Sequence, residues 1–430
     1  MKKWIFISLL LFVSLSFTQV LQRFPKPDFQ SGYERPVMQT PAPRSLVLEY
    51  LDVGVLLLVL SLTTYFAHRR RSRRLIFTMM IFSIAYFGFF RKGCICPVGS
   101  VQNVVYSFFN ADYVIPLTVV LFFLLPLIFT LFFGRTFCAA VCPLGAVQDV
   151  VVVKPLSLPK WLSSVLSLFP FIYLGFAVLF ASVGAGFIIC RYDPFVGFFR
   201  LSGSFNMIFL GGFLLLLGTI VARPYCRFLC PYGVLLNWFS RLSRRHVRIT
   251  PSVCINCRLC EASCPFDAIH KPTTAEIPED KIVLVRRIIL ICILLPLMMV
   301  SSGWMISRLY VPLASVHPVV SLAEEIKLED SGLRTEVSDA TQAFRAAGKS
   351  TADLFAEAHA VQQKVKTGGW ILGGFLGLIF GFKLIRLTAY RRYSEYEIDQ
   401  GDCLSCGRCF SYCPVDKNGQ TIIRLNTEVT

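Results

Sequence analysis

The sequence predicts an all-α polytopic membrane protein with a small α+β domain assembled from two separated parts of the chain. Of the 430 residues, 55% are hydrophobic and only 16% are charged, whereas soluble globular chains carry about 25% charged residues. Several apolar runs reach the roughly 20 residues that a helix needs to cross about 30 Å of hydrocarbon. A third observation, a doubled cysteine run near residues 254–264 and 403–413, predicts the small domain.

The apolar runs give the expected spans. Residues 1–20 form an apolar stretch after two Lys and are expected to be a signal peptide or an anchor. Residues 21–45, rich in Pro, are expected to be periplasmic. Further runs predict about seven mature spans, or eight if the first segment is retained. These runs are residues 46–67, 75–90, 114–133, 162–189, 205–222, 282–305 and 370–387.

Basic residues orient these spans. The net charge is +17, and most Lys and Arg lie beside the ends of apolar runs, as the positive-inside rule requires. This placement argues against nucleic-acid binding, and the basic block at residues 68–74 marks a cytoplasmic end. Alternation then gives a transmembrane core at residues 46–248, a cytoplasmic segment at 249–281 and a transmembrane helix at 282–306. A periplasmic helical segment at 307–368, a second transmembrane helix at 369–390 and a cytoplasmic end at 391–430 follow.

In the last span, Gly373, Gly377 and Gly381 recur at four-residue spacing. Small residues at this spacing allow two helices to approach closely in lipid. The alternative is that these glycines are merely tolerated.

The two cysteine runs share one pattern. Each has three Cys at C-x-x-C-x-x-C spacing and a fourth Cys, four residues further on, followed by Pro. In bacterial ferredoxins three such thiolates hold one 4Fe-4S cluster, and the fourth binds the other cluster. We therefore expect a cytoplasmic two-cluster ferredoxin-like domain, with zinc as the alternative. Cluster one takes Cys254, Cys257, Cys260 and Cys413, and cluster two takes Cys403, Cys406, Cys409 and Cys264.

Three further motifs lie at the ends of apolar runs. Each has an Arg three residues before its first Cys and Pro-x-Gly after its last Cys. Two of them continue alike, as Val-Gln-Asn-Val and Val-Gln-Asp-Val, and Cys190-Arg-Tyr-Asp193-Pro194 is a degenerate fourth copy. Grouped by membrane face, these copies predict two sites. The inner membrane-edge site comprises Cys138, Cys142, Cys226 and Cys230, and the outer site comprises Cys94, Cys96 and Cys190.

The inner set supplies the four thiolates that one 4Fe-4S cluster needs. The outer set supplies three, so Asp193, a water or a partner would complete it, or its cluster is of another type. We expect Arg91, Arg135 and Arg223 to support the anionic clusters, because a buried anion is costly without cations nearby. Redox-active thiols, a copper site and, for the outer set, a disulfide are the alternatives.

The two faces are separated by about 30 Å of hydrocarbon, which is long for direct electron transfer. Either these Cys lie in re-entrant segments nearer the middle, or another carrier intervenes. The five His lie outside the apolar spans, which argues against a membrane haem held by paired His. The sequence has no Gly-rich dinucleotide fingerprint and no P-loop, so the chain itself is not expected to bind NAD or ATP.

These combined motifs resemble the NapH/NosR-type membrane polyferredoxins, which are associated with periplasmic nitrate and nitrous oxide respiration. The resemblance covers residues 75–269 and 402–414, and rests most on the strings at 133–145 and 225–233. It implies 4Fe-4S clusters and electron transfer between the quinone pool or cytoplasmic donors and a periplasmic acceptor. Many relatives in the nitrous oxide branch carry a periplasmic flavin-binding domain before the first helices. Only residues 21–44 occupy that place here, so any flavin would belong to a partner.

We therefore expect an electron-transfer component of an oxidoreductase system in the cytoplasmic (inner) membrane. Its expected partners are other redox subunits, with a periplasmic flavoprotein or reductase and quinol as candidates. Membrane ferredoxins that reduce copper during cytochrome oxidase assembly share these motifs. A copper-ion reductase or assembly factor is thus the first alternative, and an iron-sulfur scaffold without turnover is the second.

Overall fold

The computed structural model describes most of the membrane part and both cysteine runs. Its described residues are 44–93, 96–153, 155–156, 158–247, 249, 254–255, 257–273, 281–334, 337–388, 393 and 395–414. The predictions for residues 1–43, for Cys94 and for residues 415–430 lie outside the described residues.

Within the described residues, five helices are long and apolar enough to cross a membrane, namely residues 46–70, 73–90, 161–183, 282–308 and 351–388. Two further apolar helices, α5 (Leu117–Phe133) and α11 (Phe205–Gly218), are shorter. At 1.5 Å per residue they extend about 26 Å and about 21 Å, which is less than the roughly 30 Å hydrocarbon core. The described residues therefore give five long spans instead of the seven predicted, because α5 begins at Leu117, three residues after the start of its predicted run, and α11 ends at Gly218, four residues before the end of its run.

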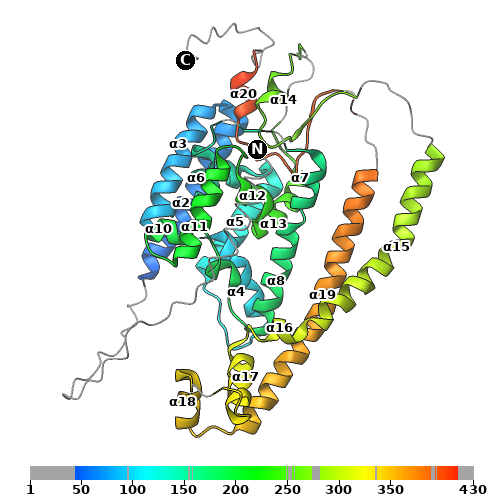
Figure 1. The fold of residues 1–430 in the computed structure, drawn as a ribbon. Coiled ribbons are helices and arrows are strands. Elements are labelled where there is room, and N and C mark those ends of the chain that lie inside the picture. The colour runs from blue at the N-terminus through cyan, green and yellow to red at the C-terminus, as the bar shows by residue number, and fades with distance from the viewer. Residues whose placement is uncertain are drawn as a thin grey trace, which may run out of the picture.

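The repeated unit of the bundle is an apolar helix, a turn that carries Cys, and a short helix that follows the turn. Pro97, Pro143 and Pro231 are the first residues of α4 (Pro97–Phe109), α6 (Pro143–Val150) and α13 (Pro231–Arg241). Pro suits this position because its fixed φ is helical and the N–H it lacks would have no partner. The short helices turn back into the bundle, where α4 packs against α5 and α8, and α13 packs against α4, α5 and α8 (Figure 1).

The first two long helices each end in a π-helical stretch: α2 (Leu46–Tyr65) runs into η1 (Phe66–Arg70), and α3 (Arg73–Ser83) runs into η2 (Ile84–Phe90). The other bundle helices are η3 (Phe137–Val141), α7 (Lys160–Leu166), α8 (Phe169–Val183), α9 (Ile188–Arg191), α10 (Val196–Arg200) and α12 (Pro224–Phe228). The bundle core is apolar and aromatic, with Leu60, Phe87, Phe195 and Tyr232 fully buried.

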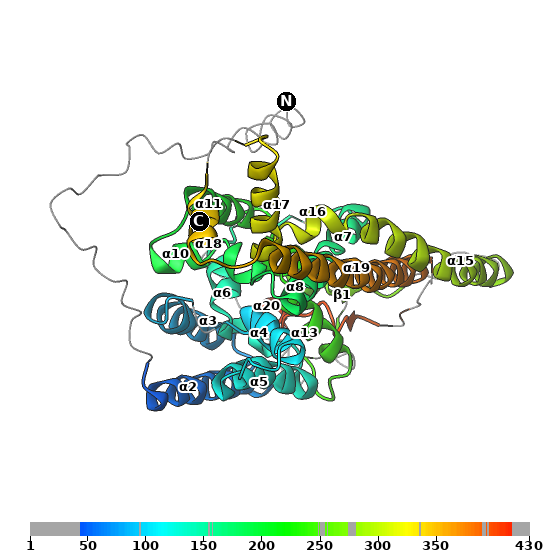
Figure 2. The ribbon, with the colours of Figure 1, turned by 90° about the horizontal axis from the view of Figure 1, so that it is seen from below.

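The helices α15 (Lys281–Arg308) and α19 (Thr351–Thr388) cross as a hairpin beside the bundle (Figure 1), and Figure 2 shows the pair from below, next to α8. On α15, Ile293 and Leu297 are 68% and 63% exposed, as expected for side chains that face lipid. Towards α19, the backbone of α15 passes directly over Gly373 and Gly377. The close-packing prediction for these glycines is therefore confirmed.

Gly373→Ala is expected to destabilise the hairpin. The added Cβ would overlap the Ser302 carbonyl oxygen and the Gly303 Cα, which are backbone atoms that cannot move aside. Overpacking of this kind costs about 1–3 kcal/mol. The matched control is Gly374→Ala, because its Cβ meets nothing within 4 Å. The thermal unfolding midpoint in detergent should fall for Gly373→Ala alone; equal midpoints for both variants would contradict this packing.

The two ends of the molecule differ in structure (Figure 1). At one end, α16 (Tyr310–Ala314), α17 (Pro318–Asp330) and α18 (Asp339–Ala346) pack with the start of α19 around Val320, Ile326 and Val365. At the other end lie α14 (Leu259–Ser263) and α20 (Arg408–Tyr412). There β1 (Ile269–His270) pairs antiparallel with β2 (Glu397–Ile398), so the two cysteine runs meet in one α+β unit.

Candidate metal centres

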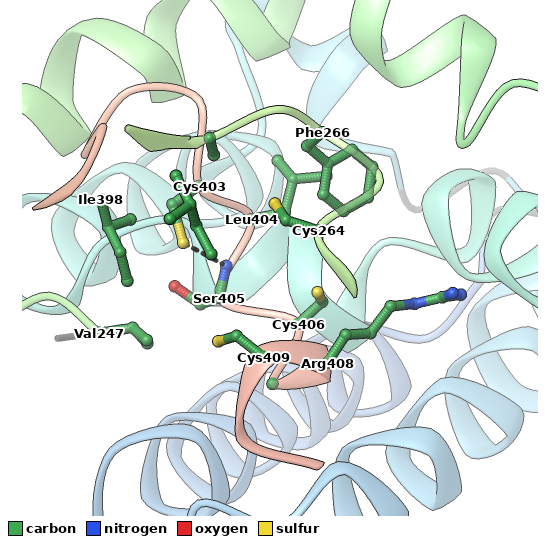
Figure 3. A pocket seen from close by; sticks show the side chains of 13 residues that line it. Val247, Cys264, Phe266, Ile398, Cys403, Leu404, Ser405, Cys406, Arg408 and Cys409 are labelled. Atoms are coloured by element: carbon green, nitrogen blue, oxygen red, sulfur yellow. Dashed lines mark hydrogen bonds between the residues drawn. The ribbon is translucent and has the colours of Figure 1, made fainter. Parts of the chain in front are cut away.

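One cavity in the α+β unit is lined by four cysteines (Figure 3). Cys403, Cys406 and Cys409 come from the segment around α20, and Cys264 follows α14. These are the four residues that the spacing assigns to cluster two, and both halves of the unit contribute. In the described part of the chain, no three His, Cys, Asp or Glu side chains are grouped as ligands of one metal ion. A 4Fe-4S cluster needs a wider arrangement, because each thiolate binds a different iron atom.

Burial shapes the chemistry of this cavity. It raises the pKa of the Cys264 thiol to about 11 and that of the Cys403 thiol to about 12. Since cluster ligands are thiolates, these residues release their protons when iron binds. The Ser405 backbone N–H already points at the Cys403 Sγ, at 3.5 Å, from a left-handed conformation with φ of 51°. Hydrogen bonds to sulfur are one means by which proteins set a cluster's potential.

The ligands predicted for cluster one lie beside this cavity. Cys254 and Cys257 are electrostatic neighbours of Cys260, and Cys413 follows α20, which packs against α14. Cys260 is in turn a neighbour of Cys409. The two ferredoxin-like sites therefore adjoin.

The inner membrane-edge cysteines also converge. Cys138 lies on η3 and Cys142 follows it, Cys226 lies on α12, and Cys230 is the N-cap of α13. The other three cysteines all interact electrostatically with Cys142. Three of the four sulfurs already receive a hydrogen bond. The donors are Gln148 Nε2 to Cys226 at 3.4 Å, the Gly233 N–H to Cys230 at 3.3 Å and Arg135 Nη2 to Cys138 at 3.8 Å. This donor set fits an anionic cluster held by thiolates.

A buried carboxylate, Asp149, connects several residues around this site by ion pairs, and it was not among the predicted site residues. Asp149, with its side chain fully buried, forms ion pairs with Arg223 at 3.1 Å, with Arg408 at 3.3 Å and with Arg73. Arg223 is itself fully buried and donates to the backbone carbonyls of Cys138 and Ala139. The sequence feature that could have indicated Asp149 is the repeated Val-Gln-Asp-Val segment, in which Asp149 follows Gln148.

Arg135 joins the inner site to the α+β unit. Its Nη2 reaches Cys138, while its Nη1 donates to the Gly401 carbonyl at 2.9 Å, two residues before Cys403. A small apolar cluster fills the space between the two sites. Cysteines from both sites pack against it, namely Cys138, Cys264, Cys403 and Cys406.

The third motif arginine has a different partner. Arg91 forms a 2.9 Å ion pair with Asp52 of α2, a buried carboxylate that also binds Arg44 and the Tyr86 hydroxyl. Arg91 therefore contacts α2, and the role of Arg91 in supporting a cluster stays a prediction. Among the three motif arginines, only Arg135 and Arg223 contact residues of the inner site.

The outer-site cysteines lie closer to the inner site than the topology predicted. Cys96 has Cys190 and Asp193 as electrostatic neighbours, and it also interacts with Cys142 and Cys230 of the inner site. Of the two explanations given for the gap, cysteines nearer the middle of the membrane fit this arrangement, whereas a separation across the whole hydrocarbon core does not. The physical reason is that Cys96 is the N-cap of α4, a short helix packed within the bundle, whereas Cys190 on α9 is exposed. Cys94 lies outside the described residues.

This fold and these sites define a helical membrane protein with ferredoxin-type cysteine motifs, and the comparison with known families agrees. Two family models, both described as a 4Fe-4S binding domain, match the chain. One matches three times, at residues 75–116, 115–161 and 204–250, and the other matches residues 247–270. The three repeats hold the three complete membrane-edge motifs. The chain therefore contains 4Fe-4S binding domains, as the cysteine spacing predicted.

Similar proteins share parts of this arrangement. YccM of Escherichia coli, whose name proposes a role in electron transport, is 29% identical over 141 residues, which are 30% of this chain and 37% of YccM. Two uncharacterised proteins of Methanocaldococcus jannaschii also match. MJ0749 is 37% identical over 16% of this chain and 27% of its own length, and MJ0750 is 28% identical over 42% and 77%. The chain thus spans about a third of YccM and about a quarter of MJ0749, and no solved structure matches it.

Proposed function

We propose that this chain relays electrons, one at a time, through a row of 4Fe-4S clusters in the cytoplasmic membrane. The donors are cytoplasmic or come from the quinone pool, and the acceptor is periplasmic. The observation that carries the proposal is the contact of Arg135 with both Cys138 and Gly401, which joins a membrane site to a ferredoxin-like site through one side chain.

The order of the sites supports a relay. Cys260 of cluster one neighbours Cys409 of cluster two, and cysteines of cluster two share an apolar cluster with Cys138. Cys142 of the inner site then neighbours Cys96 of the outer site. Each step joins adjacent sites, so no long gap lies between these four sites; the last step leads from the outer site to the periplasmic acceptor.

When bound, the clusters supply reversible one-electron chemistry. The residues of the chain hold them and adjust them. Arg223 and Arg135 offset the negative charge of thiolate-bound clusters in a medium of low dielectric constant. Gln148 and the Gly233 N–H donate to ligand sulfurs, and such donors raise a cluster's reduction potential by favouring the more negative, reduced state.

The orientation follows from the basic block at residues 68–74. Arg73 of this block donates to the Cys406 carbonyl, and the Arg71 guanidinium lies over the Phe410 ring. The block and the ferredoxin-like unit therefore share one side, which the positive-inside rule assigns to the cytoplasm. The unit around α17 would then be periplasmic, where a flavoprotein or a reductase would meet it. The resemblance to NapH/NosR-type polyferredoxins and the electron-transport role that YccM's name proposes support a role of this chain in electron transfer.

The test is electron transfer into sealed liposomes. Purified full-length protein is reconstituted around trapped ferricyanide, dithionite is added outside, and the bleaching of ferricyanide is followed under argon. Wild type should bleach it faster than protein-free liposomes do. Cys138→Ser/Cys226→Ser should fall to the protein-free rate, whereas Cys292→Ser, which alters a lone exposed Cys of α15, should match wild type.

Other outcomes would overturn the relay. Transfer that needs added copper, with no iron at the membrane sites, would favour a copper reductase or assembly factor. Clusters that neither accept nor pass electrons would favour a scaffold.

A further inference from the structure

The four membrane-edge motifs are joined in two pairs by the same contacts. The Gln102 Oε1 accepts the Ile189 backbone N–H at 2.8 Å, and the Gln148 Oε1 accepts the Tyr225 backbone N–H at 3.0 Å. Ile189 and Tyr225 are the residues just before Cys190 and Cys226. The motif around Cys96 is therefore paired with the degenerate copy, as the Cys142 motif is paired with the Cys226 motif.

The motif glycines repeat this pairing. A Cβ on Gly99 would lie 2.9 Å from the Cys190 Sγ, and a Cβ on Gly145 would lie 3.5 Å from the Cys226 Sγ. Both glycines let a helix start approach the sulfur of the partner motif. Cys190 thus occupies the place in the outer pair that Cys226 occupies in the inner pair.

The next residue in this correspondence is Asp193, which takes the place of Cys230. Each precedes a Pro and a short helical segment. The Cys230 Sγ accepts the N–H of Gly233, and the Asp193 Oδ1 accepts the N–H of Val196 at 3.3 Å, three residues further on in both cases. The Asp193 Oδ1 also accepts the Phe195 N–H at 2.9 Å.

The surroundings of Asp193 are those of a ligand. The residue is 4% exposed, and within the described part of the chain no salt bridge offsets its charge. Among the described residues, the two hydrogen bonds to its side chain both go to Oδ1, so Oδ2 is the oxygen that a metal would take. A buried carboxylate is costly unless it is paired or coordinates a metal, and Cys96 lies close enough to interact with it electrostatically.

We propose that Asp193 is an oxygen ligand of the iron-sulfur cluster that Cys96 and Cys190 bind. This rests on the proposed function, because it takes the outer site to hold a cluster. A carboxylate is a harder ligand than a thiolate, so the iron that Asp193 binds differs from the thiolate-bound iron atoms of this cluster. The outer cluster then has a potential of its own and an iron that is more readily lost or exchanged.

The experiment uses full-length protein grown on ⁵⁷Fe and purified anaerobically, examined by Mössbauer and EPR spectroscopy. Asp193→Asn keeps an oxygen that can cap the helix but removes the anionic ligand. We expect it to lose about one iron of roughly sixteen and to gain the EPR signal of an oxidised 3Fe-4S cluster. Asp193→Cys should keep all the iron, lose the oxygen-ligated Mössbauer component and shift one midpoint potential. Asp112→Asn, in the exposed loop before α5, should match wild type.

The outcomes separate the two proposals. If Cys190→Ser leaves the iron content and every signal unchanged, the outer site holds no cluster, and the relay as proposed fails. If Cys190→Ser removes a cluster signal but Asp193→Asn and Asp193→Cys change nothing, the relay stands and Asp193 is only a helix cap. The ferredoxin-like signals report in each variant whether the chain has folded.

Discussion

A chain carrying Cys138→Ser and Cys226→Ser is expected to lose about a quarter of its iron, about four of roughly sixteen atoms. Each substitution removes one of the four thiolates that meet at the inner site, one from the η3 turn and one from α12. The remaining pair, Cys142 and Cys230, cannot hold a cubane alone. The ferredoxin-like clusters should survive, because their ligands come from separate segments around α14 and α20.

Anaerobic iron and acid-labile sulfide analysis with EPR of the reduced protein checks this expectation. The matched control is Cys292→Ser, which should retain all the iron. About eight iron atoms in wild type, unchanged in the double variant, would mean that only the ferredoxin-like unit binds clusters. The membrane cysteines would then have to act as thiols or as copper ligands.

The second large effect is expected from Asp149→Asn. Removing this charge leaves Arg223, which is fully buried, without a counter-ion, and it also releases Arg73 and Arg408. Breaking a buried ion pair by deleting one partner costs about 3–5 kcal/mol. Because Arg408 belongs to the ferredoxin-like unit and Asp149 to the membrane part, the loss should also loosen the contact between them.

Thermal unfolding in detergent and limited proteolysis around residues 395–414 measure the two parts of this effect. Asp112→Asn is the control, since Asp112 is exposed in a loop. Arg408→Gln should cost less than Asp149→Asn, because it leaves two of the three cations paired. An Asp149→Asn protein as stable and as protease-resistant as the control would show that the buried network is not needed to dock the unit.

The cysteine pattern predicted which cysteines group together better than it predicted the contacts of the residues around them. The spacing around Cys264 and Cys403 carries its own geometry, so the grouping of those residues in one cavity could be anticipated from sequence. Convergence of Cys138 with Cys226 could also be anticipated, because topology places both motifs at one face. The partner of Arg91 could not be anticipated from the sequence, since Asp52 lies on another helix and no local pattern links Arg91 to Asp52.

The sequence left the depth of the sites open between re-entrant segments and an additional carrier, and the reason is physical. Hydropathy marks where a chain is apolar, but it does not distinguish a helix that crosses the membrane from one that turns back inside a bundle. The predicted run 205–222 ends as a helix at Gly218, and the segment after Cys96 re-enters as α4. The roles of Gln102, Gln148 and Asp149 were missed for a related reason. Their repetition was visible, but their partners lie on other motifs.

The pairing of Ile269 with Ile398 has a consequence for how the protein is made. One half of the α+β unit leaves the ribosome long before the other, and the α15–α19 hairpin must insert in between. Closing so long a loop is slow and entropically costly. Cys264 is therefore made long before Cys403, Cys406 and Cys409, and it meets them only when synthesis is almost finished. On the proposed ligand assignment, cluster insertion there requires both halves of the unit, and therefore a chain in which α19, the last long helix, has already been made. Iron loading thereby reports that biogenesis is complete, and truncated or misinserted chains are left without these clusters.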